Sequence, residues 1–168
     1  MRTTDEALRV VNQRPLVGSA VDRRADAGAR GRADLAFLVL RLVAGLALAL
    51  AHGINKLPPT ESFVAGVAEM GFPAPLLFAW AAGLAEFAGG LLLALGLFTR
   101  PAAFGILTTM VVATFIRQAG DPFTEREAAV LHGAIALFFL MVGPGRLSLD
   151  ARLGRRYPAL LGRGRNGG

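Results

Sequence analysis

The stretch of sequence that decides the fold is residues 74–98, which read APLLFAWAAGLAEFAGGLLLALGLF. Glu86 is the single charged side chain in these twenty-five residues. A helix needs about 20 mostly apolar residues to cross the hydrocarbon core of a bilayer. The stretch is long enough and apolar enough to predict a transmembrane helix.

Three other apolar stretches predict further spans. Residues 35–52 form an apolar run that is interrupted by Arg41. Residues 100–118 and 127–143 have uncharged centres that are short for a span, so both are expected to extend into flanking polar residues. We therefore predict an all-α fold, a four-helix transmembrane bundle.

The composition of the whole chain supports a membrane protein. Hydrophobic residues make up 54% of the 168 residues and charged residues 18%. A soluble domain has about a quarter charged residues. The chain contains no cysteine and two histidines, which excludes disulfides and thiolate metal sites and leads us to expect no metal.

The net charge of +6 is concentrated at the two ends of the chain. Residues 1–33 contain seven arginines and residues 144–168 contain six. Basic segments stay on the cytoplasmic side of a membrane, so both termini are predicted to be cytoplasmic. The arginines lack the interleaved aromatic residues of a nucleic-acid surface, so the expected partner is the lipid bilayer and not a nucleic acid.

The same patterns predict three regions. Residues 1–33 and 154–168 mix arginine, glycine and alanine without apolar periodicity, and we expect two basic, disordered tails there. Residues 34–153 then form the membrane domain. Between the first two spans, Thr60 is positioned to cap a short helix that reaches Met70. This helix would lie on the outer membrane surface, cover a pocket as a lid, or pack on the bundle.

Two charged side chains lie within the predicted spans. A charge in the bilayer core costs at least ~2.5–3.5 kcal/mol, so Arg41 and Glu86 should face the bundle and have partners. At 100° per residue, Gly45 and Gly90 lie on the same faces as these charges, where small residues permit close helix contact. We predict an intramembrane ion pair between Arg41 and Glu86. Its role as a functional site or as a contact that fixes helix register stays open.

A second polar group is predicted at the other end of the bundle. His52, Lys56 and His132 fall at similar depth on inward faces, and Thr108 and Thr109 add hydroxyl groups nearby. These residues form a candidate outer pocket for a polar head group, a quinone ring or a proton relay. The alternatives are an interface role for His132 and a membrane-surface anchor for Lys56.

Several short motifs resemble those of the DoxX family, in the order and spacing of that family. They are HGINKL at 52–57, GFP at 71–73, EFAGG at 86–90, LGLFTR at 95–100 and GPGRLSLD at 143–150. The resemblance covers roughly residues 35–153. It implies a four-helix integral membrane protein, and relatives of this family include subunits associated with a quinol oxidase and a thiosulfate:quinone oxidoreductase.

The resemblance implies a redox-linked membrane subunit that contacts quinone, in the inner membrane of a bacterium. No catalytic motif is present, so at most we expect an oxidoreductase subunit. The alternative is a non-enzymatic anchor or assembly partner for soluble redox or detoxification enzymes, which would bind at the cytoplasmic tails. A small-solute or proton conductor is less favoured, because four short spans form a pore only as a homo-oligomer. Quinone is the candidate cofactor and haem is disfavoured, since it would require His52 and His132 to face each other.

Overall fold

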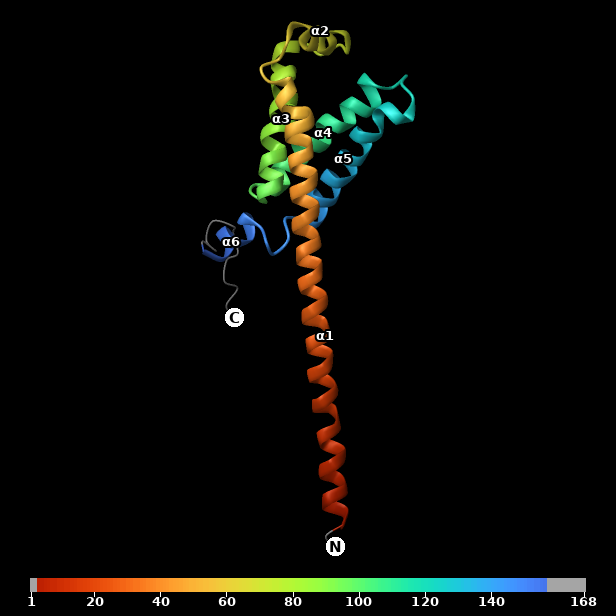
Figure 1. Cartoon of the computed structure of the whole chain (residues 1–168), viewed down its shortest axis with the longest axis vertical. Coiled ribbons are helices and arrows are strands. Elements are labelled where there is room, and N and C mark those ends of the chain that lie inside the picture. Colours follow the sequence, from red (N-terminus) through yellow and green to blue (C-terminus); the bar gives the residue numbers. More distant parts are fainter. Residues whose placement is uncertain (1–2, 157–168) are drawn as a thin grey trace. The chain divides into compact units, whose positions relative to one another are not determined.

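The computed structural model describes residues 3–156, and it describes side chains from residue 25 to residue 154. All secondary-structure elements in this part of the chain are helices, joined by turns and short loops, and it contains no strand (Figure 1). The elements are α1 (Thr3–Ala47), the π-helical η1 (Leu48–Gly53), the short 3₁₀ turn η2 (Ile54–Lys56), α2 (Glu61–Glu69), α3 (Pro75–Leu95), α4 (Thr99–Val112), the π-helical η3 (Ala113–Arg117), α5 (Phe123–Val142) and α6 (Leu149–Arg156).

The chain divides into two compact units, Met1–Ala36 and Phe37–Gly168. In the first unit, residues 3–33 belong to α1, whereas residues 1–33 were predicted to form a disordered tail; residues 1–2 lie outside the described residues. Alanine, arginine, leucine and glutamate are good helix formers, and they favour a helix even where no apolar face repeats. Of the second predicted tail, residues 154–156 belong to α6, and residues 157–168 lie outside the described residues.

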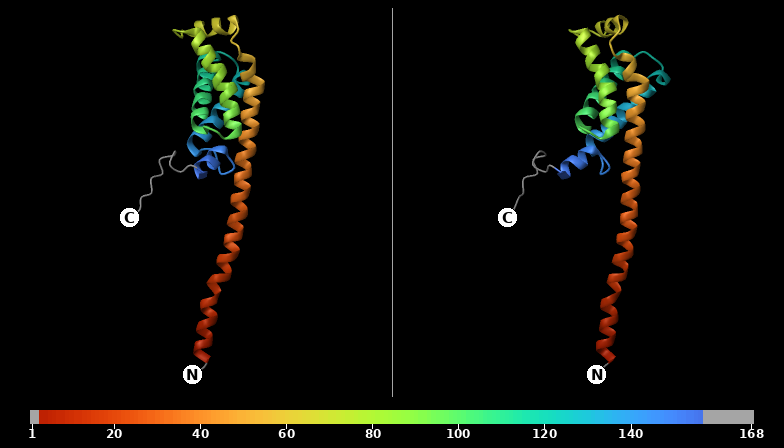
Figure 2. Two further views of the ribbon diagram at one scale, coloured as in Figure 1. Left: turned by 90° about the vertical axis from the view of Figure 1, so that its left-hand side faces the viewer. Right: turned by 60° about the vertical axis from the view of Figure 1, so that its left-hand side comes forward.

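In the described part of the chain, three helical stretches are long and apolar enough to cross a membrane: Ala25–Lys56, Pro75–Leu95 and Thr99–Arg117. The fourth predicted span coincides with α5, which is helical from Phe123 but carries three charged residues in its first turns, at positions 125–127. Figure 2 shows α3, α4 and α5 side by side with the segment 37–56. The bundle of the second unit is therefore built from four helical stretches, of which three meet the criteria for a span.

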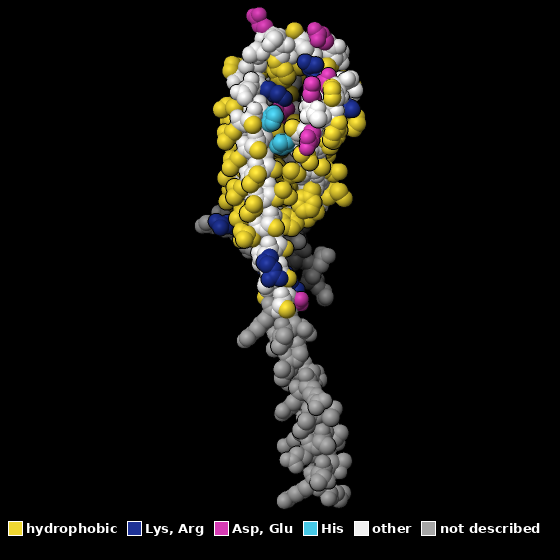
Figure 3. All heavy atoms as spheres, turned by 45° about the vertical axis from the view of Figure 1, so that its right-hand side comes forward, with side chains coloured by type: hydrophobic (Ala, Val, Ile, Leu, Met, Phe, Trp, Pro, Cys, Tyr) yellow, Lys and Arg dark blue, Asp and Glu magenta, His cyan; other side chains and the backbone are white. Residues whose placement is uncertain are grey.

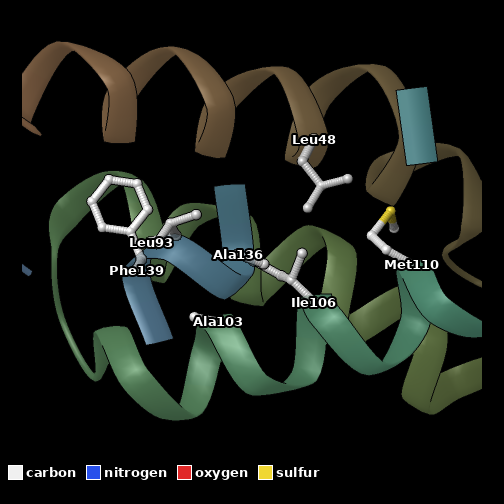
Figure 4. Packing of buried hydrophobic residues seen from close by; sticks show 7 residues of the cluster. All are labelled: Leu48, Leu93, Ala103, Ile106, Met110, Ala136 and Phe139. Carbon is white, nitrogen blue, oxygen red and sulfur yellow. The ribbon is translucent and has the colours of Figure 1, made fainter. Parts of the chain in front are cut away.

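The interior of the bundle is a small apolar cluster to which all four stretches contribute. Phe139 and Ala136 of α5 are fully buried, as is Ala103 of α4. Figure 4 shows these side chains converging between the helices. The complete cluster is Leu48, Leu93, Ala103, Ile106, Met110, Ala136 and Phe139. The outer surface of the bundle is apolar too, because many large apolar side chains of the same helices are exposed (Figure 3).

The segment 37–56 crosses α3 at very short range. A Cβ atom added to Gly45 would lie 2.5 Å from the carbonyl oxygen of Gly90, and one added to Gly90 would lie 2.7 Å from that of Gly45. Further along, a Cβ on Gly53 would lie 2.4 Å from the backbone nitrogen of Phe87. The predicted small-residue contact between these two helices is confirmed. It also holds Lys56 close to the middle of α3.

The predicted cap at Thr60 is confirmed, and the ends of two other helices have similarly local causes. The Thr60 hydroxyl accepts a hydrogen bond of 3.3 Å from the backbone N–H of Phe63 at the start of α2. Gly143 ends α5. The Ser148 hydroxyl accepts a hydrogen bond of 3.0 Å from the backbone N–H of Ala151 at the start of α6. These caps satisfy N–H groups that have no partner within the first helical turn.

Candidate ligand-binding site

Glu86 has a buried carboxylate that is only half satisfied. It lies in the middle of α3, and its side chain is 1% exposed. Its Oε1 atom is 2.5 Å from Nζ of Lys56, and its Oε2 atom is buried without a hydrogen-bond partner. A buried carboxylate requires a cation to compensate for lost hydration, and Lys56 provides it. The second oxygen is thus unpaired within the described part of the chain.

The structure gives Arg41 and Glu86 partners different from those predicted. The Arg41 side chain is buried, and its Nε atom donates to the carbonyl oxygen of Ala94 at 3.2 Å. Its two terminal nitrogens donate to the carbonyl oxygens of Pro144 and of Leu147, the latter at 2.9 Å. The guanidinium thus satisfies carbonyls at the end of α3 and in the segment before α6. The predicted ion pair does not form, because that segment folds back onto Arg41.

Arg41 lies in a structural junction that consists of the segments 95–100 and 143–150, the Arg41 junction. The Asp150 carboxylate accepts hydrogen bonds of 2.8 Å from the N–H of Phe98 and 2.9 Å from that of Thr99, where α4 begins. Gly96 has a φ of +67°, and a Cβ there would lie 2.6 Å from Cζ of Arg41. This junction fixes the turn between α3 and α4 to the C-terminal segment.

At the opposite end of the bundle lies a cavity of about 380 Å³, the polar cavity. Figure 3 shows the two histidines (cyan) at its rim, with basic and acidic side chains around its mouth. The ionisable side chains that line the polar cavity include His52, Lys56, Glu86, Arg117, Glu125 and His132. The structure thus brings together three of the five predicted pocket residues and adds Glu86 to them.

The two histidine rings of the polar cavity pack against each other in a T-shaped contact. Their ring centroids are 5.8 Å apart, and the ring planes are inclined by 70°. Nδ1 of His132 lies 2.8 Å from the carbonyl oxygen of Ala128. A carbonyl only accepts, so Nδ1 carries the proton, and Nε2 of the neutral ring is an acceptor. Within the described residues, no group of three His, Asp or Glu side chains is arranged to hold a metal ion.

The remaining predicted pocket residues, Thr108 and Thr109, do not line the polar cavity. Their hydroxyls donate at 3.0 Å to the carbonyl oxygens of Phe104 and Gly105, one turn earlier in α4. Both threonines line a second cavity of about 400 Å³, the apolar cavity, which lies between α2, α3 and α4. The two threonines therefore do not join the predicted pocket residues of the polar cavity.

The sequence analysis missed several cavity residues beyond the third span. Arg117 ends η3, Gln118 follows it, and Asp121 and Glu125 come from the connection to α5 and its first turn. The signal was the run of charged residues at 117–127, which lies where the predicted third and fourth spans are connected. Both π-helical segments line the polar cavity, η1 with His52 and η3 with Arg117. Such segments occur frequently at functional sites.

An apolar exterior, several helices of spanning length and a polar cavity at one end define a multi-pass α-helical membrane protein. Residues 36–119 match the model of the DoxX family, and the chain belongs to this family. An uncharacterised membrane protein of Mycobacterium tuberculosis is 34% identical over 137 residues, which are 73% of this chain and 83% of that protein. An uncharacterised protein of Haemophilus influenzae is 36% identical over 124 residues, 69% of this chain and 87% of that protein. No solved structure matches the chain.

Proposed function

We propose that this DoxX-family protein binds the head group of a membrane quinone in the polar cavity and serves as the membrane subunit of a redox system. The observation that carries the proposal is the buried Oε2 atom of Glu86. Glu86 lines the cavity, and Oε2 has no hydrogen-bond partner among the described residues. A native protein rarely leaves a buried carboxylate oxygen unpaired, and a ligand hydroxyl would pair with it.

The cavity contains groups that suit both redox forms of a quinone. The two carbonyl oxygens of a quinone accept hydrogen bonds, and the Lys56 ammonium is a donor. The two hydroxyls of a quinol donate, and Oε2 of Glu86 and Nε2 of His132 are acceptors. Oxidation of a quinol releases two protons and two electrons. In this proposal, Glu86 and His132 accept the protons, and the electrons pass to a partner redox protein.

We propose a four-span topology with both termini in the cytoplasm of a bacterium. The twenty residues of α5 give a length of about 30 Å, enough for a hydrocarbon core. The basic ends of the chain favour a cytoplasmic location, and the segment at 117–127 has two basic and three acidic residues, which suits the outer side. Both relatives come from bacteria. The polar cavity would then open toward the outer face of the inner membrane.

The test is to measure quinone bound to the purified protein. Three proteins are purified in native lipids: wild type, Glu86→Gln and the control Glu69→Gln. The control changes an exposed acid of α2. Bound organic molecules are extracted from each protein and assayed for quinone by redox difference spectroscopy. We expect near-stoichiometric quinone in wild type and in the control, and its loss in Glu86→Gln at an unchanged helix content. Wild-type protein without quinone, or equal quinone in all three proteins, contradicts the proposal.

A second candidate function is an anchor for soluble redox enzymes. The observation that favours it is α6, which follows the Arg41 junction and adds basic residues such as Arg152 to the side that we assign to the cytoplasm. Arg152→Glu combined with removal of residues 157–168 would abolish partner capture, whereas Glu86→Gln would leave it intact. Capture lost only in Glu86→Gln would refute the anchor.

A further inference from the structure

The polar and apolar cavities share part of their walls. Lys56, Ala113 and Arg117 line both of them. Lys56 stands at the boundary, because its Nζ atom is 2.5 Å from Oε1 of Glu86 on one side and 5.6 Å from the ring centroid of Phe63 on the other. A molecule that reaches Lys56 in one cavity is therefore next to the other.

The apolar cavity has the form of a chain-binding groove. Its lining residues on the α4 side extend from Phe104 to Arg117, which is about 20 Å at 1.5 Å per residue. Ala82 and Ala85 leave room on α3, and apolar side chains such as Phe63 and Val67 cover the cavity from α2. This length and lining suit an alkyl or isoprenoid chain better than a compact ring.

We propose that the two cavities form one site for an amphiphile, with its polar head group at Lys56 and Glu86 and its apolar chain in the cavity under α2. The inference rests on the proposed function for the head group. It adds that the protein also recognises the apolar chain of the ligand and that this chain lies in the apolar cavity. Helix α2 then has a function in binding, because its apolar face closes the apolar cavity over the ligand chain. An unrelated phospholipid chain in the apolar cavity is the rival occupant.

The test compares two ligands that share a head group. Full-length protein in phosphatidylcholine nanodiscs is titrated with 2,3-dimethoxy-5-methyl-6-decyl-1,4-benzoquinone and with the same benzoquinone without the decyl chain. Ala82→Phe fills the apolar cavity from α3. Gly105→Leu fills it from α4, where an added Cβ meets only Ala85 Cβ at 3.6 Å. Leu84→Phe is the control, because Leu84 is 48% exposed and lines neither cavity.

We expect Ala82→Phe and Gly105→Leu to weaken binding of the decyl ligand at least tenfold and to leave the short ligand unchanged. Leu84→Phe should change neither affinity. Each variant is compared with wild type for the same ligand, so the greater partitioning of the decyl ligand into lipid cancels. Using two filling variants keeps the test decisive if one of them does not fold.

The outcomes separate this inference from the proposed function. Binding of both ligands that depends on Glu86 but is unaffected by the filling variants overturns the chain site and leaves the head-group site standing. The same result, accompanied by loss of a co-purifying phospholipid from Ala82→Phe, assigns the apolar cavity to that lipid and also overturns the inference. If neither ligand binds to wild type, the proposed function fails as well.

Discussion

Lys56 contacts one oxygen of Glu86 at 2.5 Å and leaves the other oxygen of the same carboxylate without a partner. A pair that served only to fix helix register would be most stable with both oxygens satisfied, because each unpaired buried polar atom costs free energy. The one-sided contact therefore supports the proposed binding role of Glu86.

The first prediction concerns the stability of this pair. Lys56→Met leaves the Glu86 carboxylate buried without a cation. We expect it to lower the free energy of unfolding by about 2 kcal/mol, less than the roughly 3–5 kcal/mol of a fully buried pair, because the Lys56 side chain is 32% exposed. SDS titration followed by the fluorescence of Trp80, the single tryptophan, measures it.

The double variant Lys56→Met/Glu86→Gln provides the control. It removes both charges, and we expect its stability to equal that of Glu86→Gln alone. Additive losses in the double variant would show that the two side chains are not energetically coupled.

The second prediction concerns the crossing of the segment 37–56 with α3. In Gly90→Ala, the new Cβ would lie 2.7 Å from the carbonyl oxygen of Gly45, so we expect a loss of about 1–3 kcal/mol from overpacking. Gly66→Ala is the matched control, because nothing lies within 4 Å of its Cβ. Alanine there should stabilise α2 by about 0.5–1 kcal/mol. Equal melting temperatures for the two variants would contradict the close crossing.

The apolar pattern was sufficient to predict most of this fold. The uncharged surroundings of Glu86 indicated a buried helix, and its small-residue face indicated close contact with the helix that carries Gly45. The cap at Thr60 followed from local chemistry alone. These features depend on neighbours within one or two turns of helix, so a single sequence contains them.

The partners of the buried charges depended on longer-range structure. The angular positions assumed 100° per residue, but residues 48–53 are π-helical, and this altered spacing lies between Arg41 and Lys56. Two of the three carbonyls that bind Arg41 come from a loop more than 100 positions away in the sequence. No periodicity encodes either effect, so the predicted Arg41–Glu86 pair was wrong while both residues were correctly expected to be buried.

The third prediction concerns the Arg41 junction. Arg41→Lys keeps the charge, but a single ammonium cannot place donors at three separated carbonyls as the planar guanidinium does. We expect a loss of roughly 1–3 kcal/mol for each carbonyl left without a donor, measured by thermal unfolding followed by circular dichroism. Arg152→Lys, at an exposed position of α6, should have no effect. A fully stable Arg41→Lys protein would mean that the guanidinium geometry is dispensable.

The fourth prediction concerns the proposed topology, and the absence of cysteine from the chain makes it directly testable. Single cysteines are introduced at three exposed positions, Ser62 in α2, Thr124 in α5 and Arg152 in α6. A membrane-impermeant maleimide is added to intact cells and then to permeabilised cells. We expect Ser62→Cys and Thr124→Cys to react in intact cells, because α2 and the start of α5 lie on the outer side in the proposed four-span arrangement.

Arg152→Cys should react only after permeabilisation, because α6 follows the fourth span on the cytoplasmic side. The comparison also tests α5, which is the one helix of the bundle that fails the criteria for a span. If α5 did not cross the membrane, Thr124→Cys and Arg152→Cys would react under the same condition. Labelling of Arg152→Cys and Thr124→Cys in opposite compartments thus requires α5 to span the bilayer despite the charged residues in its first turns.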